Sequence, residues 1–444
     1  DSFFMMGNPE ENLSGILSAT ADTIRNPFIR MYEDYLLSKI SWNNYGLVGL
    51  SIIHIGQVIP SLTMARILRK RFKHMHIVIG GSVFNRHADL LDDKQELFKQ
   101  FFHSLIVSEG EQPLDQLLCH LKENKPLNTV PNLIYLEDDR VVRNPKSEAL
   151  PYDQLVCPTF DQLPLEKYLM PYTVLPYMSS RGCYWGKCTF CTHSFIYDSH
   201  YRKENEVRVA EELDHLSKKY KTKYFTFSDE AISPNAFNRM SKEILKRGVD
   251  MRALGMLKFE SSEKESPELF DDIYRAGFLM LFFGLESAND RVLALIDKGT
   301  TKEVERDVLK KSHKAGIWNH SFLFFGFPTE TRPEAQETID FLRDNLDSIH
   351  SFGPGVFLLN RDSSCYQYPE KFSIERIIED PERNIAMNLD FVAKEGMSRE
   401  EAGEMNNKCI SMAEEFFQTL NLWGTLPREH FLLYLDKFGK EALN

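Results

Sequence analysis

The sequence SSRGCYWGKCTFCTHSF at residues 179–195 places three cysteines within nine positions. It follows the apolar run 174–179, whose length and composition indicate a buried strand. Thiols this close together in one loop can converge on one metal centre, and iron–sulfur clusters favour soft thiolate ligands. We therefore predict that Cys183, Cys188 and Cys191 bind a [4Fe–4S] cluster and leave one of its irons open.

A structural zinc ion is the alternative for this loop. Such a site needs four ligands, and the nearest other cysteines, Cys157 and Cys365, are distant in sequence. His193 lies two positions after the last cysteine of the loop and could complete a zinc site. The position of the loop after a strand favours the cluster, but the three cysteines alone leave both sites open.

Strands and helices alternate regularly after this loop. The sequence predicts strands at 174–179, 223–228, 251–257, 279–285, 320–325 and 355–359, and helices at 205–219, 235–247, 267–276, 290–295, 302–315 and 332–345. These make about six βα units, fewer than the eight of a complete barrel. We predict a partial (βα)6 barrel over residues 173–360, with functional groups at the carboxyl ends of its strands.

A second alternating series precedes the loop. Strands are predicted at 45–53, 76–79 and 104–107, helices at 60–72 and 113–124, and a hairpin at 131–136 and 140–144. This order predicts an α/β protein whose residues 1–150 form a Rossmann-like domain with a parallel sheet. Residues 151–172 are predicted to be a linker. Residues 361–444 are predicted to be a mainly helical carboxyl-terminal region.

Composition excludes several classes of function. The chain has 444 residues, enough for two or three domains, and its net charge of −12 disfavours nucleic acid as a partner. It has no run of about 18 apolar residues and no secretory signal at its start, so we expect no membrane span. Seven cysteines, three of them clustered, favour a reducing compartment, and we expect a cytoplasmic protein. Because the first residue is not Met, we expect the sequence to begin inside a longer protein.

The flanks of the cysteine loop, Arg-Gly-Cys before it and Cys-Thr-Phe-Cys at its end, resemble the cobalamin-binding branch of the radical S-adenosylmethionine (SAM) superfamily. The usual spacing in that superfamily is C-x3-C-x2-C, whereas this chain has C-x4-C-x2-C, with residues 184–187 in the longer first gap. We interpret the difference as a tolerated insertion. We expect Tyr184 and Trp185 either to line the site or to pack.

Three further segments match the same family in order: FSDE at 227–230, FGLES at 283–287 and FGFPTET at 325–331. The resemblance implies SAM-binding roles for Phe190, Asp229, Glu230, Lys258, Glu286, Ser287 and Gly326.

The implied role of each group has a structural alternative. Asp229 or Glu230 would hold the methionine amino group, or else cap a helix. Lys258 would contact the methionine carboxylate, or else lie exposed. Glu286 would accept hydrogen bonds from SAM, or else begin a helix. Phe190 would lie against the adenine, and the turn at Gly326 would lie near it.

The same resemblance implies a cobalamin site in the amino-terminal domain, which we expect to lack its first elements. The implied residues are Ser51, Gln57, Gly80, Gly81, Ser82, Glu109 and Gly110. The alternative is ordinary turn chemistry, because any Rossmann-like sheet needs such glycines. The motif Asp-x-His-x-x-Gly is absent, since Ile52 stands two positions before His54, so we expect no histidine ligand on cobalt.

The resemblance implies reductive cleavage of SAM at the cluster, giving a 5′-deoxyadenosyl radical. Methylcobalamin would then methylate an unactivated carbon of a peptide or natural-product intermediate. An electron donor such as flavodoxin or ferredoxin would be a partner, and no acid–base residue is implied. One alternative is radical rearrangement or oxidation without methyl transfer, and another is a binding protein with structural zinc. We expect Cys365 and Cys409 to pack in the core, and the carboxyl-terminal region to cover the barrel mouth.

Overall fold

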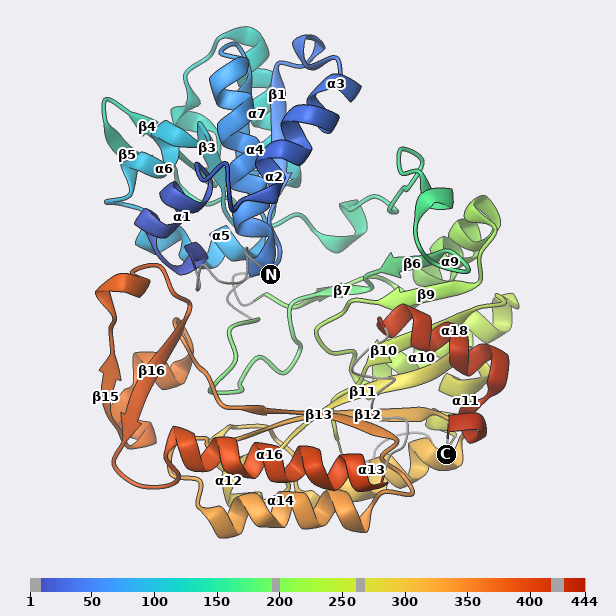
Figure 1. Ribbon diagram of the computed structural model, residues 1–444. Coiled ribbons are helices and arrows are strands. Elements are labelled where there is room, and N and C mark those ends of the chain that lie inside the picture. The colour runs from blue at the N-terminus through green and yellow to red at the C-terminus, as the bar shows by residue number, and fades with distance from the viewer. Residues whose placement is uncertain (1–8, 194–199, 261–267, 417–426, 444) are drawn as a thin grey trace. The chain divides into compact units, whose positions relative to one another are not determined.

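The computed structural model describes residues 9–193, 200–260, 268–416 and 427–443. The chain divides into two compact units (Figure 1). The first consists of Asp1–Leu150, Phe195–Asp198 and Ile378–Asp390, and the second of Pro151–Ser194, Ser199–Ile377 and Phe391–Asn444. Each unit has its own sheet, and the predicted α/β class is confirmed.

The first unit contains a five-stranded sheet in the order β1-β2-β3-β4-β5. Its strands are β1 (Leu47–Ser51), β2 (His76–Gly80), β3 (Ser104–Ile106), β4 (Leu133–Glu137) and β5 (Arg140–Arg143). The first three are parallel, and β4 and β5 form an antiparallel hairpin beside them. The predicted order of strands and hairpin is therefore found.

The helices of the first unit are α1 (Leu13–Ala19), α2 (Pro27–Met31), α3 (Leu37–Lys39), α4 (Val58–Arg71), α5 (Ser82–His87), α6 (Gln95–Gln100) and α7 (Glu111–Glu123). Several of them contribute buried apolar residues to its core. In α4, Leu62, Ala65 and Leu68 are fully buried and belong to the same core as Ile77 and Ile79 of β2. This unit therefore has its own hydrophobic core.

The second unit contains a six-stranded sheet in the order β13-β12-β11-β10-β9-β6. The strands are β6 (Val174–Tyr177), β9 (Tyr224–Phe227), β10 (Arg252–Met256), β11 (Phe278–Glu286), β12 (Trp318–Phe325) and β13 (Ser351–Val356). All neighbours are parallel. The carboxyl ends of the strands therefore meet at one edge, as predicted for a partial barrel.

Helices α9 (Glu206–Tyr220), α10 (Pro234–Arg247), α11 (Leu269–Arg275), α12 (Asp290–Leu295), α13 (Lys302–Lys314) and α14 (Arg332–Asp344) connect these strands. Helix α10 shows why the sequence forms them. Ser233 caps its first turn, Pro234 occupies its first position, and Gly248 ends it in the left-handed conformation. Its buried Phe237 packs edge-on against Phe278 of β11, with ring centroids 4.7 Å apart.

The last barrel strand lies earlier than the sequence predicts. The prediction is 355–359, whereas β13 spans Ser351–Val356. Its sequence, SFGPGV, is rich in residues that normally disfavour strands. It is tolerated because β13 is an edge strand, with β12 as its one neighbour in the sheet.

The carboxyl-terminal region contains strands that the sequence analysis missed. Helices α15 (Ser364–Gln367), α16 (Arg399–Phe416) and α18 (Arg428–Phe438) agree with the predicted helical character. However, β15 (Ile374–Ile378) and β16 (Asn388–Ala393) form a three-stranded sheet with β14 (Leu359–Asn360), within a region predicted to be mainly helical. β16 alternates about Leu389 and Phe391, and such a short apolar run does not distinguish strand from helix.

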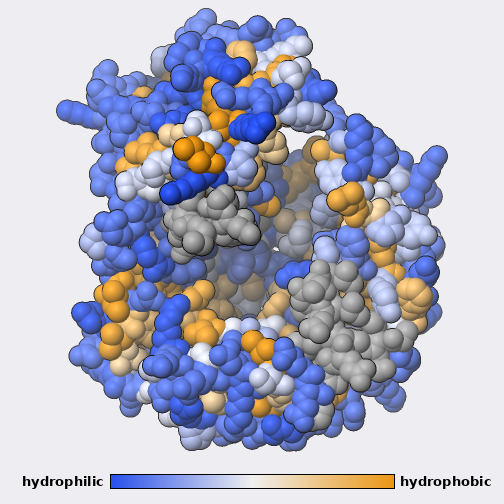
Figure 2. Space-filling model, viewed as in Figure 1, coloured by the Kyte–Doolittle hydropathy of each residue, from blue (hydrophilic) through white to orange (hydrophobic). Residues whose placement is uncertain are grey.

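Two of these helices cover opposite faces of the barrel sheet. α16 packs with α14 and against β12 and β13, and Met405 and Cys409 join the core on that side. α18 packs against Leu254, Met280 and Trp318 on the opposite face. Along the strands these residues alternate with the residues that face α16 and its core. The face of the molecule seen in Figure 2 is mostly hydrophilic, with its hydrophobic residues in scattered small groups.

None of the described helices combines the length and the apolar composition that crossing a bilayer requires.

Candidate functional site

The cysteine loop begins at the carboxyl end of the first barrel strand. After β6, the short strand β7 (Ser180–Arg181) pairs antiparallel with β8 (Arg202–Lys203). Gly182 then turns the chain with φ +79°, and a Cβ at this position would lie 2.9 Å from the carbonyl oxygen of His200. The sequence therefore needs glycine before Cys183 so that the loop can leave the two-stranded ladder.

The three thiols lie close enough to influence one another electrostatically, and all are partly exposed. Burial raises the pKa of Cys188 to about 11 and that of Cys191 to about 12. These two thiols therefore keep their protons until a metal displaces them. The backbone N–H of His193 donates a hydrogen bond of 3.4 Å to Sγ of Cys191.

Three thiols without a carboxylate are a donor set suited to an iron–sulfur cluster. Within the described residues, no three His, Cys, Asp or Glu side chains form a group that could hold a single metal ion. The ligands of a four-iron cluster lie farther apart than those of one ion, because the cubane itself lies between them. The loop residues therefore fit the predicted cluster in their chemistry.

His193, the candidate fourth zinc ligand, is paired with a carboxylate. Its Nδ1 lies 2.8 Å from Oε2 of Glu230, one of the residues predicted to bind SAM. His193 lies in the cysteine loop that follows β6 and β7, and Glu230 follows β9, which is the neighbour of β6 in the sheet. Glu230 therefore lies at the site, with one carboxylate oxygen facing the imidazole.

Asp229 lies in different surroundings from the adjacent Glu230. Its buried carboxylate accepts hydrogen bonds from the backbone N–H of Ser179 at 3.0 Å, from the hydroxyl of Ser179 at 2.7 Å and from the hydroxyl of Ser180 at 2.5 Å. These bonds use its acceptor capacity to fix the start of the cysteine loop. Asp229 is therefore a poor candidate for contact with a ligand.

Glu286 ends β11 and forms an ion pair behind the cysteine loop. Its Oε1 lies 2.8 Å from Nζ of Lys298, and both side chains are nearly buried. Burial disfavours the charge of Lys298, but Glu286 together with Cys188 and Glu305 outweighs burial, so the pKa of Lys298 is raised. Gly284 makes room for the pair, because a Cβ there would lie 2.4 Å from Oε1 of Glu286. The glycine of the Gly-Leu-Glu segment is thus explained by the ion pair.

Lys258 is buried rather than exposed. Its Nζ donates to the carbonyl oxygens of Phe259 at 3.1 Å and of Gly299 at 3.3 Å, and burial lowers its pKa. The ammonium also lies 4.2 Å from the ring centroid of Trp185, in the first gap of the cysteine loop. The structure therefore brings this predicted residue to the loop.

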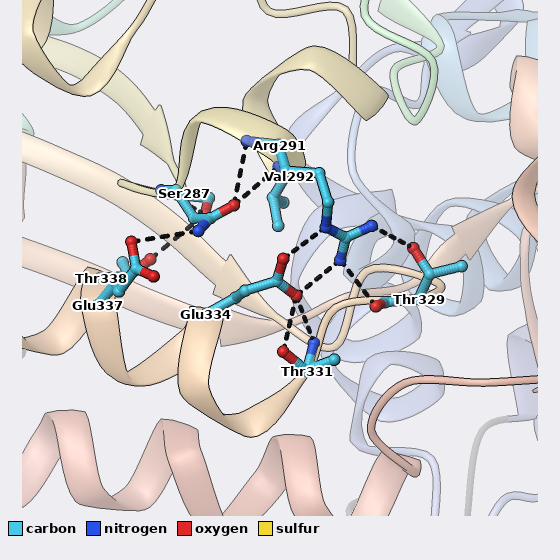
Figure 3. A network of polar contacts seen from close by, with 9 residues as sticks. Ser287, Arg291, Val292, Thr329, Thr331, Glu334, Glu337 and Thr338 are labelled. Carbon is cyan, nitrogen blue, oxygen red and sulfur yellow. Dashed lines mark hydrogen bonds and ion pairs between the residues drawn. The ribbon is translucent and has the colours of Figure 1, made fainter.

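Ser287 belongs to a polar network that joins two loops (Figure 3). Its fully buried hydroxyl is hydrogen-bonded to Oγ1 of Thr338, 3.2 Å away, in α14. Nearby, Arg291 donates to Thr329 and binds Glu334, which caps α14 together with Thr331. Ser287 therefore links the start of α12 to α14, and its hydroxyl is already hydrogen-bonded within the protein.

Gly326 and Phe190 lie near the carboxyl end of β12. Gly326 has φ +85°, and its N–H donates a 2.6 Å hydrogen bond to Oε2 of Glu330. Glu330 is buried, its Oε1 has no hydrogen-bond partner among the described residues, and burial raises its pKa to about 7. Phe190 packs edge-on against Phe324, with centroids 5.0 Å apart. Both predicted residues thus lie at the strand edge that carries the cysteines.

The predicted cobalamin residues gather at one edge of the first unit. Ser51 and Gly80 are paired in register at the ends of β1 and β2, and Glu109 and Gly110 follow β3. Gly81 has φ +95°, and a Cβ there would lie 2.4 Å from the carbonyl oxygen of Ile52. Gly81 is therefore needed for the close contact with the backbone of Ile52, whether or not a ligand binds at this edge.

Two predicted side chains in this unit are used locally. Oε1 of Gln57 accepts from the N–H groups of Ile53 at 2.9 Å and His54 at 3.1 Å, which closes a capping box. The hydroxyl of Ser82 donates to the carbonyl oxygen of Ile53 at 3.1 Å. These bonds support the turn chemistry that was the alternative interpretation.

Residues 177–342 match the sequence model of the Radical SAM superfamily. The second unit carries a radical SAM domain. A relative, an uncharacterised methyltransferase of Pyrococcus horikoshii, is 27% identical over 287 residues, which cover 63% of this chain. The chain spans 60% of the length of that relative.

Solved structures share the fold of both units. OxsB, a cobalamin-dependent SAM radical enzyme solved with aqua-cobalamin and SAM bound, superposes with a TM-score of 0.70 at 16% identity, covering 96% of this chain and 68% of its own. The radical SAM methyltransferase TsrM of Kitasatospora setae gives a TM-score of 0.58 at 16% identity, covering 76% and 66%. The predicted Rossmann-like unit followed by a radical SAM barrel is therefore confirmed as the fold.

The radical SAM domain also contains a buried carboxyl that the sequence analysis missed. Glu305 in α13 is fully buried, neither carboxylate oxygen has a hydrogen-bond partner within the described part of the chain, and burial raises its pKa well above the usual value. It interacts electrostatically with Lys298 and Glu286. Helical periodicity could have found it, because Glu305 shares the buried face of α13 with Val308, Leu309 and Ser312.

Proposed function

We propose that this chain is a cobalamin-dependent radical SAM enzyme that methylates an unactivated carbon of a peptide or natural-product intermediate. Cys183, Cys188 and Cys191 would hold a [4Fe–4S] cluster, and SAM would bind at the carboxyl ends of the barrel strands. Cobalamin would bind at the edge of the first unit that carries Ser51, the Gly80 turn and the 108–110 turn. The fold shared with OxsB and TsrM supports this assignment.

The chemistry would come from the bound groups, because the cluster supplies the electron that cleaves the sulfonium of SAM and cobalamin supplies a methyl group. The side chains of this protein would bind and orient. Lys258 would face the methionine carboxylate, Glu230 the methionine amino group, and Glu286 the polar groups of SAM. Asp229 and Ser287 would stabilise the loops, as their internal hydrogen bonds indicate.

An aromatic cluster beside the loop would keep water from the reacting centre. Phe190 contacts Phe324, and Phe324 lies next to Phe327 and Phe357, with centroid separations of 6.4 and 5.7 Å. These rings come from the cysteine loop, from β12, from the turn after it and from the segment after β13. Exclusion of water protects reactive species and strengthens electrostatic contacts to the substrate.

The single observation that carries the proposal is the position of the three thiols, on one loop at the carboxyl edge of a parallel six-stranded sheet. Functional groups of such folds lie at this edge.

Anaerobic reconstitution tests the proposal. We expect about four irons and four sulfides per chain, an absorption band of a [4Fe–4S] cluster, and release of 5′-deoxyadenosine and methionine from SAM after reduction with dithionite. Hydroxocobalamin should be retained through gel filtration. Zinc without iron, or no cleavage of SAM, would contradict the proposal. Cleavage of SAM without retention of cobalamin would instead support radical chemistry without methyl transfer.

A further inference from the structure

The longer first gap of the cysteine loop is hydrogen-bonded to two other loops, one that follows a strand and one that follows a helix. The hydroxyl of Tyr184 donates a 2.5 Å hydrogen bond to Oε1 of Glu260, which follows β10. Nε1 of Trp185 donates a 2.7 Å hydrogen bond to the carbonyl oxygen of Asp297, which follows α12. The first gap is therefore a built part of the site rather than a loose insertion.

Trp185 packs against Gly299, where any side chain would clash with the indole ring. Gly299 has φ +65°, and a Cβ there would lie 2.2 Å from Cζ2 of the indole. The ring therefore occupies the space that a side chain at Gly299 would need. Two ammonium groups lie over the same indole, that of Lys258 at 4.2 Å and that of Lys187 at 4.8 Å from its centroid.

The two lysines differ in their surroundings. Lys187 is exposed, whereas Lys258 is only 6% exposed and interacts electrostatically with Cys183 and Cys188. The carboxylate of Glu260 lies 3.9 Å from Nζ of Lys258, beyond hydrogen-bond distance, and its Oε1 accepts from Tyr184. Lys258 therefore binds backbone carbonyls and an aromatic face, and its side-chain nitrogen lies within electrostatic reach of two of the cysteines.

We propose that Trp185 is a positioning residue that holds the Lys258 ammonium beside Cys183 and Cys188, where the cation stabilises the reduced state of the cluster. The inference rests on the proposed cluster and assigns a function to the longer first gap. Reduction adds one electron from an external low-potential donor, and no bond forms or breaks. A cation in a weakly polar environment favours this added negative charge, and nearby charge and hydrogen bonds set the potential of such clusters.

The test is a double-mutant cycle on the midpoint potential of the reconstituted protein, followed by EPR spectroscopy during a redox titration. Trp185→Ala should lower the potential by the equivalent of about tenfold weaker binding of the electron, which is about 59 mV for a one-electron couple. Lys258→Met should lower it by a similar amount. In the Lys258→Met background, Trp185→Ala should produce no further decrease, because the indole acts through the ammonium.

Two more variants separate this role from simple packing. Trp185→Phe keeps an aromatic face and loses the bond to Asp297, so we expect it to restore most of the potential. Lys187→Ala is the matched control, because this lysine lies over the same ring in water, where screening weakens its effect. We expect less than a twofold change in the equilibrium constant for reduction.

The outcomes are distinguishable from failure of the proposed function. If the wild-type chain assembles no iron–sulfur cluster, the proposed function is wrong. If it assembles the cluster, and Trp185→Ala shifts the potential equally in the wild-type and Lys258→Met backgrounds, the positioning role is wrong. If Trp185→Ala does not assemble the cluster, the same cycle with Trp185→Leu decides, and Trp185→Phe is the aromatic reference.

Discussion

The strand ends of the two units differ in the polar side chains that they carry. In the radical SAM domain, charged groups are buried at the edge that carries the cysteines, and Lys258, Lys298 and Glu286 face one another or the loop. In the first unit, Gln57 and Ser82 at the corresponding edge bind the neighbouring backbone.

This difference indicates two kinds of site. Burying a charged side chain is costly, so a group of buried charges at one edge of the sheet indicates a functional site. The edge of the first unit instead offers glycines and short turns, which suit the close approach of a large ligand to the backbone. Chemistry is therefore expected in the second unit and binding by shape in the first.

Removal of one cysteine thiol should give the largest effect, and it tests whether the second unit is the one that carries the chemistry. Cys188→Ala should reduce the iron content of reconstituted protein from about four per chain to near zero, because a cubane with two protein ligands is not held. Metal analysis and absorption spectra measure this. Cys119→Ala is the matched control, since Cys119 is exposed in α7 of the first unit, and it should keep its full iron content. Full iron in the Cys188 variant would overturn the assignment of this ligand.

Gly81→Ala should give the next largest effect, and it acts on the first unit alone. The new Cβ would meet the carbonyl oxygen of Ile52 at 2.4 Å in a backbone conformation with φ +95°. We expect the free energy of unfolding to fall by about 3 kcal/mol. Hydrogen exchange in β1 and β2 measures this loss separately from the second unit.

Gly46→Ala is the matched control for this change, because a Cβ there meets nothing within 4 Å. We expect it to leave exchange in β1 and β2 almost unchanged. Equal protection in the Gly81 and Gly46 variants would show that the first unit does not need its glycine turn, and that the turn serves a ligand alone.

The two units also differ in how far their sites could be predicted from sequence. The cysteine loop was placed correctly at a strand end because the thiols, the preceding glycine and the strand run are adjacent in sequence. Asp229 and Glu230 could not be told apart, because both are acidic neighbours and only the fold directs one toward Ser179 and the other toward His193. The ion pair of Glu286 with Lys298 was missed because the two residues are twelve positions apart in sequence and only the fold brings their turns together.

The elements show the same limit. Strands β9, β10 and β11 were predicted well because each is an apolar run between helices with clear periodicity. β13 and β16 were misplaced or missed because their pairing with neighbours outweighs weak local preference. Helix α16 spans Arg399–Phe416 in the region predicted to be mainly helical, and residues 417–426 lie outside the described residues.

Glu330→Gln should show how much of the buried charge in the radical SAM domain acts against stability. Its pKa is about 7 in the folded protein, above the usual 4.5, because burial disfavours the carboxylate. The protonated group therefore stabilises the fold fully below pH 4.5, and this contribution is lost as the pH rises to about 7. At pH 8, Glu330→Gln should raise the free energy of unfolding by about 2 kcal/mol.

Thermal or denaturant unfolding from pH 5 to pH 8 measures this effect, and the variant should lose less stability over that interval than the wild type. Glu303→Gln is the matched control, because Glu303 is largely exposed in α13. Its curve should parallel that of the wild type. A Glu330→Gln curve that also parallels the wild type would show that the carboxyl is accommodated without cost.

Thr331→Ala should have the smallest effect, because it removes a contact at the margin of the site rather than a buried charge. Thr331 caps α14, and its hydroxyl donates to Oε2 of Glu334 at 2.8 Å in a capping box (Figure 3). Loss of such a cap costs about 1 kcal/mol, which unfolding at pH 7 can measure. Thr331→Ser keeps the hydroxyl and should be nearly neutral. If Thr331→Ala instead cost as much as Gly81→Ala, the network of Figure 3 would be a main support of the cluster edge, and stability in the radical SAM domain would depend on its exposed caps as much as on its core.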